Sequence, residues 1–529
     1  MATRGKIAAE TCLSPMANPP DISPETAPGG PPAASAAAHR REHTAIRNVT
    51  LLLLLRGLIV AGGMTTASLV PRVMGPATYG RYDLITMLTF WFTLLGGLGT
   101  GQIVSRQAPQ LEAEAAGDKL RVIFSGLLAL RILSSAVVAI LYFLTTRLWL
   151  RDLDGTVLLV LSVAVLLRVP AQLCYSLFLG QGRIGRWAVP EVVRQWGSVA
   201  FALPCFLVGG LRGAVGGYLL SEATIFAVGF VGARRSISRH ALRLDMHAIS
   251  PLLRLGLAFY ASDLVISAIE RSGAVMVRLV THDYAQVGMF GVSYQVFMAA
   301  VLSTNQISNS FVPLLTVLRA KNEDAEQRLW VERLVKWLAV TATLGLLGSL
   351  ILGKDLVPLV LGRAYRPVYL NLIAMAVTLL FLPLTHVCSV LALTHDRPAM
   401  LFRAALLRLL CFWGLGVPLI MHWNSLGACV AVCLAIVAQA AYLVGKNAAV
   451  VIPALRRWGV VVGVGLAFAP LALLRASVPL NVVIFFVAAG GYLLVLRALG
   501  AISARELRAV YRALGIGKAE RGGGMVAGA

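Results

Sequence analysis

Residues 51–60 read LLLLLRGLIV, a run of apolar residues and glycine around a single arginine. Apolar runs of about 17–25 residues suit helices that cross the ~30 Å hydrocarbon core of a bilayer. Such runs recur along the chain, which is 58% hydrophobic and only 13% charged, whereas soluble domains are about 45–50% apolar and about 25% charged. The composition therefore predicts an all-α polytopic membrane protein.

Fourteen apolar runs are expected to form transmembrane helices. They lie near residues 48–71, 82–105, 121–144, 155–179, 189–209, 213–233, 253–280, 286–315, 334–353, 368–393, 400–421, 425–445, 459–475 and 481–498. The last two are the weakest as a pair, so a count of twelve helices stays open.

The lysines and arginines predict the orientation. If the N-terminus lies inside, those in cytoplasmic segments outnumber those in outer loops by more than three to one. Cytoplasmic loops carry an excess of Lys and Arg, so both termini are expected in the cytoplasm. The net charge of +23 comes from short clusters between apolar runs, which argues for contact with membrane lipids and against nucleic acid as a partner.

No pattern of catalytic or metal-binding residues is visible. The seven cysteines form no CxxC pair, and the eight histidines do not gather beside them. No Ser/His/Asp set, P-loop or paired-carboxylate site appears. We therefore expect no catalytic residue, no metal and no cofactor.

An internal repeat is suggested when the chain is shifted by 214 positions. This shift places several pairs of residues in register, namely Cys174 and Cys388, Arg183 and Arg397, Arg194 and Arg408, Pro204 and Pro418, and Gly213-Ala214 and Gly427-Ala428. An offset of six helices keeps the orientation and predicts two pseudo-symmetric six-helix bundles around a central cavity, related by an axis along the membrane normal. Chance similarity between apolar helices is the alternative.

The expected organisation follows from these runs and from composition. It comprises a disordered cytoplasmic tail rich in Pro, Ala and Gly at 1–46, a bundle at 47–233, a basic cytoplasmic linker at 234–252, a bundle at 253–446, two additional C-terminal helices at 447–498, and a basic cytoplasmic tail at 499–529.

The expected seventh helix is the most highly charged. Its residues 263–279, DLVISAIERSGAVMVRL, contain Asp263, Glu270, Arg271 and Arg278. Each ionisable group costs about 2.5–3.5 kcal/mol at mid-bilayer, more in sum than the apolar residues here return. Residues seven apart share a helix face, so the acidic and basic pairs form two adjacent lines. The helix is expected to face a hydrated cavity, with pairing to Arg131 or Glu222 of neighbouring helices as the alternative.

Other ionisable residues need less explanation. Arg168, Glu191 and Arg194 lie close enough to expected helix ends to snorkel to the interface. Arg56 lies deeper, about 12 Å into the first helix, where five leucines offset most of its ~3 kcal/mol cost. Insertion energy therefore permits Arg56 without assigning it a role.

Several motifs resemble one family. The segment RVMGPATYGRYDL at 72–84 is similar to the R-x-L-G-P-x-x-Y-G-x-Y turn of the polysaccharide flippase branch of the multidrug/oligosaccharidyl-lipid/polysaccharide exporter superfamily. The matching residues are Arg72, Gly75, Pro76, Tyr79, Gly80 and Tyr82, with Met74 at the usual Leu. Further similarities are VGMFGVSYQVF with SFVPLL, LGRAYRPVYLNLIAM, and NSLGACVA. Together the motifs cover roughly residues 47–450.

This resemblance implies two six-helix bundles around a V-shaped cavity, with two extra helices, and transport by alternating access. The implied cargo is an undecaprenyl-diphosphate-linked oligosaccharide for exopolysaccharide, O-antigen or capsule synthesis, moved across the bacterial inner membrane. A flippase of this kind is a transporter rather than an enzyme. A polysaccharide polymerase or export machinery is an implied partner.

The charged residues suggest how such a cargo is held. Arg56, Arg271 and Arg278 are candidates for gripping the diphosphate, and Asp263 and Glu270 for coupling to protons or sodium. Arg131 and Glu222 are secondary candidates.

Two alternatives stay open. One is a membrane-embedded polysaccharide polymerase or ligase, disfavoured by the lack of a large outer loop. The other is a drug/cation antiporter of the same superfamily, disfavoured by the turn motif and by a basic rather than acidic cavity. The sugar, the coupling ion and the oligomeric state are not determined by the sequence.

Overall fold

A computed structural model describes residues 32–114, 117–237, 260, 264–265, 267–268, 271–395, 397–474 and 477–502. The chain divides into two units, residues 1–53 and 54–529. Of the first unit, the backbone is helical from Pro32 onward, ahead of the helix start expected at residue 48.

The N-terminal half of the second unit is helical. Its elements are α1 (Pro32–Gly97, from residue 54), α2 (Thr100–Ala113), α3 (Gly117–Trp149), α4 (Gly155–Gly180), α5 (Ile184–Trp187), α6 (Val189–Gly197), a π-helix (Ser198–Ala202), α7 (Leu203–Ala233) and a 3-10 turn (Arg234–Ser236).

The C-terminal half is helical as well. Its elements are α9 (Gly273–Thr281), α10 (Tyr284–Ser310), α11 (Val312–Ala320), α12 (Asp324–Ile351), α13 (Gly353–Leu361), a 3-10 turn (Arg363–Tyr365), α14 (Val368–Leu379), α15 (Leu382–Thr394), α16 (Pro398–Lys446), α17 (Ala448–Phe468), a 3-10 turn (Ala469–Leu473) and α18 (Val478–Ala498). The described residues contain no strand, so the all-α prediction is confirmed.

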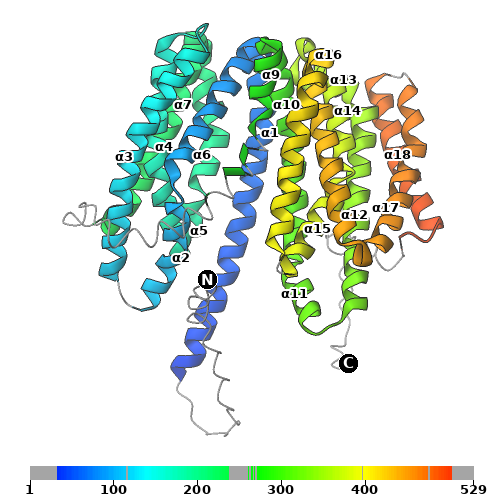
Figure 1. The fold of residues 1–529 in the computed structure, drawn as a ribbon, viewed down its shortest axis with the longest axis horizontal. Helices are drawn as coiled ribbons and strands as arrows, with labels where there is room; N and C mark the ends of the chain where they lie inside the picture. The colour runs from blue at the N-terminus through cyan, green and yellow to red at the C-terminus, as the bar shows by residue number, and fades with distance from the viewer. Residues whose placement is uncertain are drawn as a thin grey trace, which may run out of the picture. The chain divides into compact units, whose positions relative to one another are not determined.

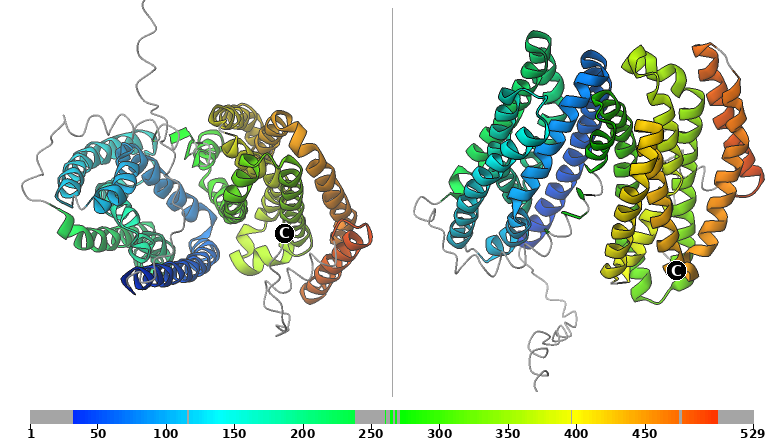
Figure 2. Two further views of the ribbon diagram at one scale, coloured as in Figure 1. Left: turned by 90° about the horizontal axis from the view of Figure 1, so that it is seen from below. Right: turned by 45° about the horizontal axis from the view of Figure 1, so that its top comes forward.

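The helices form two groups (Figures 1 and 2). In the first, α4 packs against α2, α3 and α7. In the second, α10, α12 and α15 pack around α14 and α16, and α17 and α18 lie against α12 at the flank. One buried apolar cluster includes residues of both groups, among them Leu84, Tyr142, Val277 and Phe290. The groups therefore share part of their core.

Ten helices or merged helices are long and apolar enough to span a membrane. Non-helical backbone interrupts three of them, at Gly75, at Gly209 with Gly210, and at Asn424. Dividing these three gives thirteen candidate spans among the described residues, and most of the expected seventh helix lies outside the described part. Exposed large apolar side chains such as Ile140 on α3 and Phe486 on α18 suit contact with lipid.

The expected internal repeat is visible in the backbone. Gly210 has φ 56° and ψ −140°, and Asn424, to which the shift of 214 positions carries it, has φ 50° and ψ −129°. Three positions after each lies a glycine, Gly213 or Gly427. A Cβ on Gly213 would overlap the carbonyl oxygen of Cys205, and one on Gly427 would overlap that of Leu419. Both halves thus make the same tight helical hairpin, related by the same shift.

Candidate functional site

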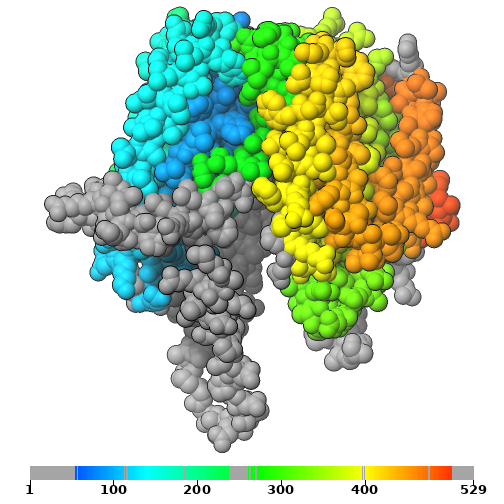
Figure 3. Space-filling model, viewed as in Figure 1, coloured from blue at the N-terminus to red at the C-terminus, as the bar shows by residue number. Residues whose placement is uncertain are grey.

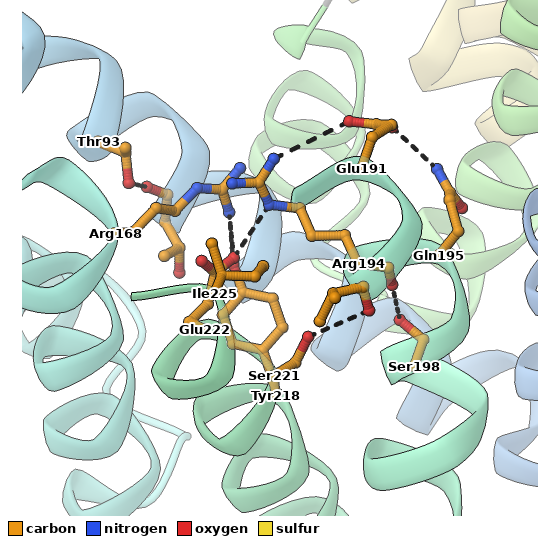
Figure 4. A network of polar contacts seen from close by, with 12 residues as sticks. Thr93, Arg168, Glu191, Arg194, Gln195, Ser198, Tyr218, Ser221, Glu222 and Ile225 are labelled. Atoms are coloured by element: carbon orange, nitrogen blue, oxygen red, sulfur yellow. Dashed lines mark hydrogen bonds and ion pairs between the residues drawn. The ribbon is translucent and has the colours of Figure 1, made fainter. Parts of the chain in front are cut away.

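A buried ionic network lies midway along the helices of the first group (Figure 4). Glu222 on α7 is fully buried. Its Oε1 accepts from Arg168 Nη1 of α4 at 3.2 Å and from Arg194 Nε of α6 at 3.3 Å. Arg168 Nη1 also donates to the hydroxyl of Tyr218 at 2.6 Å. A buried carboxylate is costly unless it is paired and hydrogen-bonded, and here two guanidinium groups share one carboxylate oxygen.

Two polar atoms of the network make no hydrogen bond within the part of the chain that the structure describes. Among the described residues, Glu222 Oε2 and Arg168 Nε have no hydrogen-bond partner. Arg194 is partly exposed, and its second carboxylate neighbour is Glu191 at 3.9 Å. The network therefore has a buried pair, Arg168 and Glu222, and a more exposed pair, Arg194 and Glu191. The expectation that Arg168 reaches the interface by snorkelling is wrong, because this side chain is 6% exposed and points to Glu222.

An aromatic ring links this network to the second half. The guanidinium carbon of Arg168 lies 5.8 Å from the ring centre of Phe90 on α1, and that of Arg271 lies 4.8 Å from the same ring. Arg271 is exposed and acts electrostatically on Asp83. The nine residues of α9 place Arg271 about 14 Å from the far end of that helix, a length about half the thickness of a ~30 Å hydrocarbon core. Two arginines from different halves thus meet one ring at mid-depth.

The family turn motif lies where the two halves touch. Gly75 has φ 73°, a conformation that favours glycine, and breaks α1 before Pro76. A Cβ on Gly80 would overlap the carbonyl oxygen of Tyr284, and one on Gly288 would overlap that of Pro76. The backbones of α1 and α10 therefore approach each other as closely as glycine allows.

Side chains of the same motif add polar links between the halves. Arg72 Nη1 donates to the Leu359 carbonyl at 2.9 Å, and the Tyr79 hydroxyl donates to Gln295 Oε1 at 3.3 Å. In the space-filling view, the green surface of α9 and α10 lies between the blue-to-cyan half and the yellow half at this end (Figure 3). The motif therefore forms the closed end of the contact between the halves.

Arg278 belongs to this closed end. Its Nη2 lies 3.4 Å from Asp152 Oδ2, its guanidinium stacks on the Tyr284 ring at 4.0 Å, and it donates to the carbonyl of His282. Tyr284 in turn donates to Asp152 Oδ1 at 3.1 Å. Arg278 therefore ties α9 to the α3–α4 loop in this conformation, away from the mid-depth position of Arg271.

Arg131 is separate from both features. It is buried on α3, where Nε donates to Thr100 Oγ1 at 2.5 Å and Nη1 to the Val169 carbonyl at 3.0 Å. These neutral acceptors join α3 to α2 and α4, which is a structural arrangement.

Nothing in the structure bears on the side chains of three of the residues singled out in the sequence. Asp263 and Glu270, and the side chain of Arg56, fall outside the described part of the chain. Sequence reasoning named Glu222 as a partner for helix 7 charges but missed Arg168 and Arg194 as its partners. The sequence contained a signal for this pairing, because two arginines and one glutamate, which carry opposite charges, occur in three consecutive expected helices. Among the described residues, no group of three or more His, Cys, Asp or Glu could hold a metal ion.

Residues 45–319 match the family described as polysaccharide biosynthesis protein, which is just over half of the 529 residues. The chain belongs to this family. No curated protein sequence gives a significant match. The family resemblance drawn from the turn motif is confirmed.

Solved structures of the same superfamily share the fold. The lipid II flippase MurJ in an inward closed conformation is 14% identical, with 86% of this chain and 99% of that chain covered and a TM-score of 0.67. An inward-facing multidrug resistance MATE family transporter of the MOP superfamily is 14% identical, with 75% and 94% covered and a TM-score of 0.57. The chain is thus a multi-pass membrane protein of the polysaccharide biosynthesis family, with the helical fold of these two transporters.

Proposed function

We propose that the protein is a flippase that moves an undecaprenyl-diphosphate-linked oligosaccharide from the cytoplasmic to the outer leaflet of the bacterial inner membrane. The family match supports a role in polysaccharide biosynthesis, and the fold is that of transporters. The oligosaccharide would then be a unit for exopolysaccharide, O-antigen or capsule, and the protein would be no enzyme. A polysaccharide polymerase would use the product outside.

The observation that carries this proposal is the exposed Arg271 at mid-depth, stacked on Phe90 with the Arg168–Glu222–Arg194 network behind the ring. Arginine binds phosphate oxygens through two parallel N–H donors. A diphosphate is the part of the cargo that most needs such a partner inside a membrane. Arg56 and Arg278 are further proposed ligands, Arg278 only once the closed end opens.

Alternating access gives the closed end its role. Charge distribution along the chain supports cytoplasmic termini, which puts the α1–α10 contact on the outer side. Arg271 would then be approached from the cytoplasm, and parting of Gly80 from Tyr284 would release cargo outward. Asp263 and Glu270 are proposed to couple this movement to protons or sodium.

A drug/cation antiporter shares this fold and is the second candidate. What favours it is the likeness to a MATE transporter. What favours the flippase is the family match and the exposed Arg271, which suits an anionic cargo.

The test is flipping in proteoliposomes. A fluorescent undecaprenyl-diphosphate oligosaccharide is reconstituted with the wild type, with Arg271→Ala, or with Arg366→Ala, an exposed arginine that serves as the control. Loss of a charge-assisted contact of about 1.5–3 kcal/mol predicts at least a tenfold slower rate for Arg271→Ala and an unchanged rate for the control. A wild type that does not accelerate flipping, or an Arg271→Ala variant at the wild-type rate, would overturn the proposal.

A further inference from the structure

A polar stretch near the end of α10 has no part in the features described so far. Residues 303–310 read STNQISNS, so seven of eight are polar within a largely apolar protein. Ser303, Gln306, Asn309 and Ser310 are exposed, and Asn305 is half-buried. Exposure of this many polar groups to lipid is unfavourable, so their surroundings need an explanation.

Helix geometry shows which way the amides point. Five full turns of an α-helix bring a later residue back to the same face. Gln306 lies five turns after Gly288, and Asn309 lies five turns after Gly291. Gly288 contacts α1 at Pro76, and a Cβ on Gly291 would overlap Asp83 Oδ2 of α1. Gln306 and Asn309 therefore face the same way as the residues that touch the other half.

At the level of the amides, however, this face of α10 is open. Gly288 is buried against α1, whereas Gln306 and Asn309 are exposed. The two halves thus contact each other at one end of α10 and leave the same helix face free about 27 Å farther along. The amides therefore lie on the face of α10 that points toward the other half.

Location at the membrane surface alone does not explain this pattern. Interfacial polarity would surround the helix, but Ile307, one residue from Gln306 and on another face, is 47% exposed. Ser308 is buried and donates to the carbonyl of Thr304 one turn earlier. The carboxamides are confined to the side that faces the other half.

Carboxamides suit one part of the proposed cargo. Each offers donors and an acceptor without charge, which matches the hydroxyls of a sugar and not a diphosphate. Asn309 Nδ2 donates to Asn305 Oδ1 at 3.1 Å, which fixes the pair and leaves Asn309 Oδ1 and the Asn305 amide hydrogens free to bind. Arg271 lies nearer the closed end, so a cargo can reach both groups with different parts.

We propose that Asn305, Gln306 and Asn309 form a carbohydrate-binding face that holds the saccharide of the cargo while Arg271 holds the diphosphate. This inference rests on the proposed function and adds the part of the cargo that gives it sugar specificity. The face lies at the end of α10 opposite the closed contact, where an incoming saccharide first meets the protein.

Binding of two probes to the full-length protein in nanodiscs tests this. The probes are undecaprenyl diphosphate and the lipid-linked oligosaccharide pool extracted from the bacterium that carries the gene. Because two hydrogen bonds to the saccharide are lost, the double variant Gln306→Leu/Asn309→Leu should bind the oligosaccharide about tenfold more weakly. It should bind undecaprenyl diphosphate as the wild type does, whereas Arg271→Ala should weaken both.

The controls separate the outcomes. Ile307→Ala, on another face, should bind both probes normally, and Gln306→Asn/Asn309→Gln, which keeps the amides, should restore much of the oligosaccharide affinity. If undecaprenyl diphosphate binds and the double leucine variant keeps full affinity for the oligosaccharide, this inference is overturned and the proposed function stands. If neither probe binds the wild type, both are overturned.

Discussion

The two halves share a backbone and differ in their interiors. Gly210 and Asn424, which the repeat places in register, adopt the same left-handed conformation, and the hairpins that follow close in the same way. The same shift places Glu222 on Ile436 and Arg168 on Leu382, both of them buried apolar residues of the second half. Among the residues that the structure describes, the ionic network therefore has no counterpart in the second half.

This difference separates what the fold requires from what it permits. The hairpin recurs because two helices can pass so closely only where glycine removes the side chain. The network does not recur, since the same position holds isoleucine in the second half without loss of the fold. The shared fold therefore does not require the charges of the first half.

The largest effect is expected from Glu222→Ile, which gives the first half the residue of the second. It leaves Arg168 and Arg194 without their shared carboxylate, and breaking a buried pair in this way costs about 3–5 kcal/mol. Thermal unfolding of the detergent-solubilised protein should show a markedly lower Tm.

Two matched variants sharpen this result. Adding Arg168→Leu restores the Leu382–Ile436 pair of the second half and should recover much of the stability, because apolar replacement of a buried pair is often neutral. Glu191→Gln, at the exposed edge, should change stability by less than about 1 kcal/mol. A wild-type Tm for Glu222→Ile alone would show that the network contributes nothing to folding.

The next largest effect concerns the shared hairpin. Gly213→Ala and Gly427→Ala each place a methyl group on a backbone carbonyl oxygen, and we expect each to destabilise by about 1–3 kcal/mol. Similar losses in the two halves, measured as Tm, would support equivalent hairpins.

The matched controls are Gly216→Ala in α7 and Gly414→Ala in α16, where a Cβ meets nothing within 4 Å. They should be neutral or slightly stabilising, since alanine favours a helix over glycine. Equal effects of the hairpin and control variants would argue against the close approach.

The smallest effect is expected at the ion pair between Asp154 and Arg212, where Oδ2 and Nε are 2.5 Å apart. The shift of 214 positions places apolar residues, Val368 and Leu426, at these two positions in the second half. Hydrogen bonds from the Thr156 side chain and backbone, helped by Arg212, hold the pKa of Asp154 below its ordinary 3.8. A lowered pKa stabilises the fold above 3.8, and this contribution is lost as pH falls through the lower folded value.

Asp154→Asn keeps the helix cap and removes the charge. Its Tm should lie slightly below that of the wild type at neutral pH, and the difference should shrink as the pH falls below 3.8 and through the lowered pKa of Asp154. A difference that stays constant with pH would exclude the charge as its source.

Much of the fold followed from local patterns. The apolar runs predicted the all-α membrane architecture. Whether a run is long enough to span the bilayer depends on its own length and not on the helices that pack against it. The shift of 214 positions predicted the repeat from the positions of glycine, proline and arginine. Gly427 shows why such residues report the repeat, because the close approach of two backbones requires glycine there. The count of fourteen helices stays a prediction, as residues 253–270 are barely described.

The site was less accessible from the sequence. Arg168 and Glu222 are 54 positions apart, and their pairing depends on the packing of α4 against α7. Arg278 on α9 carries the same charge as Arg271, which precedes α9 by two residues, yet it pairs with Asp152 at the closed end. Nothing local distinguishes these two arginines.

By itself, the sequence determined that this chain spans a membrane many times, that its halves repeat, and that a turn with Gly75 and Gly80 carries a family signature. Hydrophobic burial and glycine sterics act over a few residues, so such features can be predicted from the sequence alone. The tertiary structure alone decided which arginines pair with Glu222, which arginine is exposed beside Phe90, and in which direction the Asn309 amide points. Ionic and polar pairing depends on distances between helices far apart in the chain, and only packing sets those distances.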